Sequence, residues 1–131
     1  MSGTLGSVTT TYASVASYAP QGAPQRTNLN NGNLIEQTCF NSRLQPTTIR
    51  QRTGGAASSC SQGSNDVGYL SYSYSGTNNN GEVAGQSIYH AASGSNPARS
   101  FQQSYTAYDG VGRLGYFQET AGGNTWSQTY Q

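Results

Sequence analysis

Few residues in this sequence are of a type and spacing that could carry chemistry. Residues 110–115 read Gly-Val-Gly-Arg-Leu-Gly, a literal G-x-G-x-x-G. This pattern binds dinucleotides when a strand precedes it, a helix follows it and an acidic residue comes about 20 residues later. The residues after Gly115 have the composition of a strand, and no acid stands at that later position. We therefore predict a hairpin turn here and no cofactor.

The sequence also contains no residue pattern that supports general acid–base or nucleophilic catalysis. His90 is the only histidine, and a triad would need it beside Asp66 or Asp109 and a nucleophile. The sequence has no G-x-S-x-G nucleophile elbow and no meaningful Cys–His spacing. Nothing in the spacing of the five carboxylates brings two of them together. These are Glu36, Asp66, Glu82, Asp109 and Glu119. We predict a protein that is not an enzyme and has no catalytic residues.

The two cysteines leave two alternatives open. Cys39 falls in a strand-like run and Cys60 in a Ser-rich segment. We expect unpaired thiols ahead of a disulfide, which stays the alternative. Two cysteines and one histidine without ligand spacing do not form a zinc site, so no metal site is predicted.

Composition narrows the fold class. The chain has 131 residues, about one domain, with 33% hydrophobic residues, 8% charged residues and a net charge of +1. The sequence has no apolar run of about 18 residues, so no membrane-spanning helix is predicted. No signal peptide is readable in it either. A near-neutral chain does not favour binding nucleic acid through phosphates. Abundant Tyr, Thr, Gly, Asn and Ser favour strands and turns, so the choice lies between β-repeats and disorder.

Turn-forming clusters separate runs with β-type composition, which predicts consecutive hairpins. In the run from Leu70 to Ser75, Leu70, Tyr72 and Tyr74 alternate with serines, as in a half-exposed strand. The predicted strands cover residues 33–40, 43–50, 68–75, 82–90, 98–108, 113–120 and 125–130. The fold class is therefore all-β, built from consecutive antiparallel hairpins.

One motif carries a family resemblance. Tyr108-Asp109-Gly110-Val111-Gly112-Arg113-Leu114 resembles the YD repeat of Rhs-type and teneurin-like proteins, and residues 41–47, 72–81 and 126–130 are similar to YD-repeat proteins of soil bacteria. The resemblance implies hairpins that spiral into a β-shell. It also implies a place outside the cell or on its surface, where such shells enclose a toxin or present surfaces, and carbohydrate binding.

The resemblance gives the chain four segments. Residues 1–32 are poorly defined and could hold a partial repeat, residues 33–53 form a hairpin repeat, residues 54–67 a Ser/Gly-rich loop, and residues 68–131 hairpins of YD type. It implies a structural module of a secreted or cell-surface shell. The alternatives are a carbohydrate-binding β-module and a truncated fragment without a function of its own.

The YD motif also has a direct physical reading. Asp109 and Gly110 form turns, Gly112 can adopt a positive φ, and Asp109 can accept backbone N–H bonds within the turn. Tyr108 can pack its ring while its hydroxyl finds a partner, and Arg113 can pair with an acid or stack on a tyrosine. Residues 108–114 are thus predicted to connect antiparallel strands over 98–108 and 113–120.

Two binding modes follow from the C-terminal aromatics. Trp126, Tyr130 and Tyr116 are the candidate glycan contacts, although cross-strand packing explains most aromatic residues in sheets. Residues 125–131 have high β-propensity and no charge or proline, which favours an exposed edge. The expected partners are neighbouring YD repeats or a second copy of the chain, with carbohydrate as a further ligand.

Overall fold

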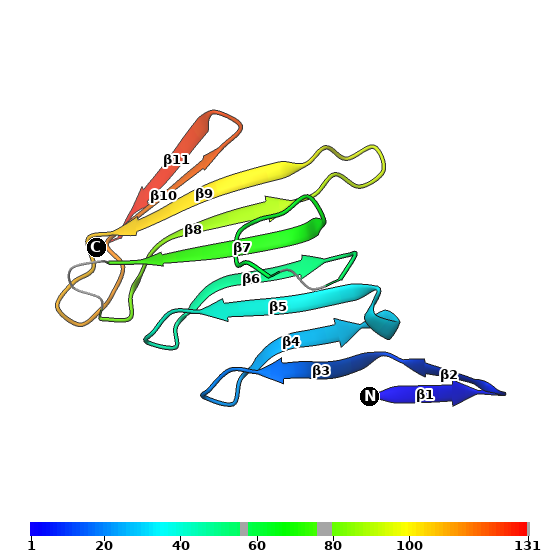
Figure 1. The fold of residues 1–131 in the computed structure, drawn as a ribbon. Coiled ribbons are helices and arrows are strands. Elements are labelled where there is room, and N and C mark those ends of the chain that lie inside the picture. The colour runs from blue at the N-terminus through cyan, green and yellow to red at the C-terminus, as the bar shows by residue number, and fades with distance from the viewer. Residues whose placement is uncertain (56–57, 76–79, 131) are drawn as a thin grey trace. The chain divides into compact units, whose positions relative to one another are not determined.

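The computed structural model describes residues 1–55, 58–75 and 80–130, and it is all-β (Figure 1). The strands are β1 (Ser2–Leu5), β2 (Val8–Thr11), β3 (Ala13–Tyr18), β4 (Pro24–Leu29), β5 (Leu34–Phe40), β6 (Pro46–Arg52), β7 (Asp66–Tyr74), β8 (Val83–His90), β9 (Arg99–Thr106), β10 (Tyr116–Ala121) and β11 (Asn124–Thr129). A short 3-10 segment, η1 (Asn30–Gly32), separates β4 from β5.

The strands pair in the order in which they follow along the chain. β1 and β2 form a separate antiparallel hairpin, and β3 to β11 form an antiparallel sheet with the order β11-β10-β9-β8-β7-β6-β5-β4-β3. Two compact units divide within β7, at Met1–Tyr69 and Leu70–Gln131. The all-β prediction is confirmed.

The first unit has a small and partly polar core. Residues opposite each other in an antiparallel pair have side chains on the same face. Arg26 pairs with Gln37 and Gln37 with Arg50, so these three side chains share one face of β4, β5 and β6. The buried residues are Ala19, Ile35, Cys39, Thr48, Arg50 and Asp66. A core with so few apolar side chains depends on polar contacts that satisfy its buried charges.

The second unit presents two different sheet faces. Gln86, Gln103, Glu119 and Trp126 lie opposite one another across β8, β9, β10 and β11. Their neighbours in the chain lie on the other side of the sheet, because side chains alternate along a strand. We call the two surfaces the aromatic face (Gln86, Gln103, Tyr105, Phe117, Glu119 and Trp126) and the hydroxyl face (Ser100, Ser104, Tyr116, Gln118, Thr120, Thr125, Ser127 and Thr129).

The predicted strands correspond to β5 to β11, and two of them begin three residues later than predicted. The strand predicted from residue 43 begins at Pro46, because Asn41 Oδ1 accepts the N–H groups of Arg43 and Gln45 and holds a turn there. The strand predicted from residue 113 begins at Tyr116, because Asp109 holds Arg113 in the preceding turn.

The predicted segments 1–32 and 54–67 also differ from the structure, and some predicted features fall on residues that the structure does not describe. Residues 1–32, predicted as poorly defined, contain β1 to β4. The predicted loop over 54–67 is described except at residues 56–57, and β7 begins within it at Asp66. Residues 76–79 of the segment 72–81, which is similar to YD-repeat proteins, lie outside the described residues, as does Gln131 of the predicted edge.

Candidate functional site

The segment Tyr108–Leu114 forms the connection between β9 and β10. Asp109 Oδ1 accepts the backbone N–H groups of Val111 and Arg113, both at 2.9 Å, and Asp109 Oδ2 accepts Arg113 Nε at 2.6 Å. The Asp109 N–H donates to Arg113 O and the Gly112 N–H to Asp109 O, both at 3.0 Å. Gly112 has φ of +80°, a conformation that glycine adopts without steric cost. The predicted hairpin connection and the role of Asp109 within it are confirmed.

The charge of Asp109 is stabilised by the turn that it organises. The backbone N–H of Arg113 is the main cause, and the Arg113 side chain and the Val111 N–H add to it. Together they hold the pKa of Asp109 below its ordinary value of 3.8. The carboxylate therefore acts as an acceptor within the turn, which is a structural role.

Tyr108 and Leu114, at the two ends of the motif, contact residues outside the turn or lie beside them. The Tyr108 hydroxyl donates to Val83 O at 2.7 Å, which ties the turn to the start of β8. Burial raises the pKa of Tyr108, and nearby Glu82 adds to this. Leu114 lines a hollow beside the turn together with Tyr130. The residues of the Tyr108–Leu114 motif therefore lie together in one turn.

The three glycines of the G-x-G-x-x-G pattern serve this turn in different ways. A Cβ on Gly110 would meet no atom within 4 Å, Gly112 supplies the positive φ, and a Cβ on Gly115 would collide with the backbone oxygen of Ala107. The element that follows Gly115 is strand β10, where a dinucleotide motif requires a helix. The hairpin interpretation of this segment is confirmed.

The aromatic face joins a row of rings to a chain of polar groups. The rings of Tyr105 and Phe117 lie 5.5 Å apart and those of Phe117 and Trp126 5.4 Å apart, measured between centroids. The Tyr105 hydroxyl donates to Gln103 Oε1 at 2.7 Å, and Gln103 Nε2 donates to Glu119 Oε2 at 2.7 Å. Burial raises the pKa of Tyr105, and neighbouring tyrosines and Glu119 add to this. This surface offers both flat rings and fixed amide and carboxylate groups.

The three candidate glycan contacts do not meet on one surface. Trp126 pairs with Glu119 on the aromatic face and is 56% exposed. Tyr116 pairs with Thr129 and therefore lies on the hydroxyl face. Tyr130 lines the hollow beside the Asp109 turn. Gln103 was not singled out from the sequence and Glu119 was considered only as a carboxylate for acid–base chemistry, because only the strand register places both residues next to the rings.

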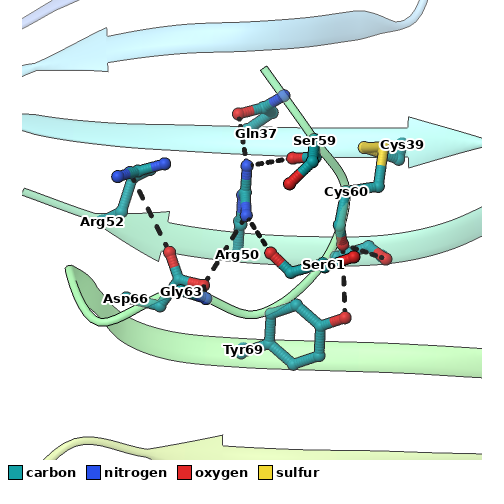
Figure 2. Close-up of polar contacts among 11 residues, drawn as sticks. Gln37, Cys39, Arg50, Arg52, Ser59, Cys60, Ser61, Gly63, Asp66 and Tyr69 are labelled. Atoms are coloured by element: carbon teal, nitrogen blue, oxygen red, sulfur yellow. Dashed lines mark hydrogen bonds and ion pairs between the residues drawn. A yellow bond between two sulfur atoms is a disulfide. The ribbon is translucent and has the colours of Figure 1, made fainter. Parts of the chain in front are cut away.

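A buried polar cluster in the first unit was also missed by sequence reasoning (Figure 2). Arg50 and Asp66 are each 1% exposed, and Arg50 Nη1 lies 3.7 Å from Asp66 Oδ2. Arg50 Nη1 donates to Ser61 O at 2.7 Å and Nη2 to Ser59 O at 2.5 Å. The Gly63 N–H donates to Asp66 Oδ2 at 2.8 Å. One buried ion pair thus fastens the loop before β7.

Cys60 lies at the centre of the fastened loop and is bonded to Cys39 (Figure 2). Thr48 Oγ1 and the Tyr69 hydroxyl each lie 3.3 Å from Cys60 O, to which they donate. Arg50 of β6 binds the carbonyls on either side of Cys60, and this ties the loop to β6, whereas the disulfide ties it to β5. The two cysteine Cα atoms lie 6.1 Å apart, within the usual range for a disulfide. The expectation of unpaired thiols is therefore wrong.

The candidate groups for catalysis are dispersed. His90 is exposed at the end of β8, and Asp66 and Asp109 are paired with arginines in different units. Glu36 accepts a hydrogen bond from Gln51, and Glu119 accepts one from Gln103. Among residues 1–55, 58–75 and 80–130, no group of three or more His, Cys, Asp or Glu side chains could hold a metal ion.

In the part of the chain that the structure describes, no helix is long and apolar enough to cross a membrane. Comparisons with protein-family models, curated proteins and solved structures find no match for this chain.

Proposed function

We propose that this chain is a non-catalytic structural module of YD-repeat type, which continues a larger sheet in a protein that works outside the cell or on its surface. The observation that carries the proposal is the state of β11, which is an edge strand with all six residues exposed. An edge strand presents unpaired N–H and C=O groups that a further strand can bind. A following hairpin of the same kind would complete this pairing.

The turn at residues 108–114 supports the same proposal. Asp109 uses both carboxylate oxygens to hold the turn, and Tyr108 ties it to β8. These contacts explain why a tyrosine followed by an aspartate suits the turns of a hairpin array.

The disulfide supports a place outside the cytoplasm. Disulfides form and persist in oxidising environments, which include the cell surface and the extracellular space. The Cys39–Cys60 bond joins the loop before β7 to β5 and encloses a small polar core. A module with so few buried apolar residues would gain from such a covalent link.

The proposal is tested by adding one repeat. A second copy of residues 98–130, appended after Tyr130, should pair with β11, protect its outer amide protons from exchange and raise the urea midpoint. The control carries Asp109→Ala in the added copy only, which weakens the added turn. An added copy that stays unfolded, or a far-UV circular dichroism spectrum of the original chain without β signal, would favour a fragment without a function of its own.

A second candidate function is carbohydrate binding on the aromatic face. Trp126 is exposed, and Gln103 and Glu119 present polar atoms beside the ring row. Sugars bind to such combinations because their apolar faces stack on rings while their hydroxyls pair with amides and carboxylates.

A glycan array distinguishes this candidate from the structural one. Binding should be lost in Trp126→Ala and kept in Tyr116→Ala, because Tyr116 lies on the hydroxyl face. Equal losses in both variants, or no binding by the original chain, would reject a site on the aromatic face.

A further inference from the structure

The backbone of β11 has a defined inner and outer side. The Tyr130 N–H donates to Gly115 O at 2.8 Å, so this opposed pair is a hydrogen-bonded one. Hydrogen-bonded and non-hydrogen-bonded pairs alternate along an antiparallel ladder. The register of β10 and β11 therefore turns the N–H and C=O groups of Trp126 and Gln128 toward β10. Those of Thr125, Ser127 and Thr129 point to the open edge.

The outward residues are symmetric about Ser127. Thr125 and Thr129 stand two positions on either side of it, and all three side chains lie on the hydroxyl face. β11 contains no charged residue and no proline, so nothing in the strand repels or blocks a second β11. A strand with this symmetry is complementary to itself when the second strand runs antiparallel.

The other edge strand of the sheet lacks this property. The pairing of β3 with β4 has register shifts between Val15 and Ser17 and between Ser17 and Tyr18. Bulges of this kind twist an edge and interrupt the row of groups that a further strand would bind. β11 pairs with β10 over its whole length without such a shift.

We propose that two copies of this chain associate through β11, antiparallel, about a two-fold axis at Ser127. Ser127 of each copy then faces Ser127 of the other, and Thr125 of each faces Thr129 of the other. This register uses every outward group and makes about six backbone hydrogen bonds. It also sets hydroxyl side chains opposite one another and places Trp126 of each copy opposite Gln128 of the other, which removes exposed ring surface from water.

Other registers satisfy fewer groups. A shift by two residues leaves an outward residue of each copy unpaired and reduces the backbone hydrogen bonds to about four. A shift by one residue sets outward groups opposite inward ones and puts opposed side chains on different faces. The arrangement centred on Ser127 is therefore the one that we expect.

Charges placed at the axis test both the partner and the register. The inference rests on the proposed role of β11 as an open edge. The experiment measures the dimer dissociation constant by sedimentation equilibrium for the original chain, for Ser127→Lys, for Ser127→Glu and for an equimolar mixture of the two variants. Each variant alone brings like charges together and should weaken the dimer about fivefold, whereas the mixture should recover it. The control is Ser100→Lys, an exposed position on the hydroxyl face away from the edge, which should dimerise as the original does.

Amide exchange gives a second readout that does not depend on substitution. Protection at Thr125, Ser127 and Thr129 should rise with protein concentration, whereas protection at Trp126 and Gln128 should not change. A monomeric original chain at high concentration, or a Ser127→Lys variant that associates as tightly as the original, would overturn the inference. If the original chain is monomeric but the appended repeat pairs with β11, self-association fails and the proposed structural function stands.

Discussion

The Cys39–Cys60 bond should contribute a large share of the stability of the first unit. The cysteines are 21 positions apart, and the loss of the loop-closure constraint on the unfolded chain corresponds to about 3 kcal/mol. The double variant Cys39→Ser/Cys60→Ser should therefore lose about 3 kcal/mol of unfolding free energy. With a urea m-value of about 1.5 kcal/mol/M, the midpoint falls by about 2 M. Urea titrations followed by far-UV circular dichroism measure this midpoint.

Arg50 provides the matched perturbation, because it holds the carbonyls on both sides of Cys60. Arg50→Met removes one partner of a buried ion pair and should cost about 3–5 kcal/mol. The disulfide and Arg50 fasten the same loop, so the two changes should be non-additive, with a coupling of about 0.5–3 kcal/mol in a double-mutant cycle. A loss below about 1 kcal/mol without the disulfide, or strict additivity with Arg50→Met, would refute the reasoning.

Three further predictions concern the second unit. Gly115→Ala should destabilise the chain by about 1–3 kcal/mol, because its Cβ meets the Ala107 backbone oxygen, whereas Gly110→Ala, which meets open space, should stay within about 0.5 kcal/mol in urea unfolding. The lowered pKa of Asp109 means that its contribution to stability is present above pH 3.8 and is lost as the pH falls through the folded-state pKa. The NMR shifts of the Val111 and Arg113 amides should follow this loss, and Asp109→Asn should abolish the dependence. Burial raises the pKa values of Tyr105 and Tyr108 above 10.0, so their contribution is present below pH 10.0 and is lost as the pH rises through the folded-state values. Absorbance at 295 nm should show their late titration, and Tyr105→Phe should remove part of it.

Patterns that depend on neighbouring residues were readable from the sequence. The turn at Asp109 is set by an acceptor side chain and a glycine a few positions away, so its hairpin could be predicted without knowledge of the rest of the fold. The alternation of Tyr72 and Tyr74 with serines marked a strand for the same reason. The turn at residues 41 and 42 was predicted, but it extends to Gln45, because Leu44, a residue type that rarely adopts a positive φ, has φ of +62° there.

The sequence by itself determined the all-β class, the approximate places of β5 to β11 and the chemistry of the Tyr108–Leu114 turn, because these follow from local alternation and turn preferences. Only the tertiary structure decided that Cys39 is bonded to Cys60, that Arg50 pairs with Asp66, and that Tyr116 and Trp126 lie on opposite faces. Each of these depends on strand register or on contacts between distant residues. A shift of one residue in register moves every side chain of a strand to the other face, and a weak local pattern does not fix that choice.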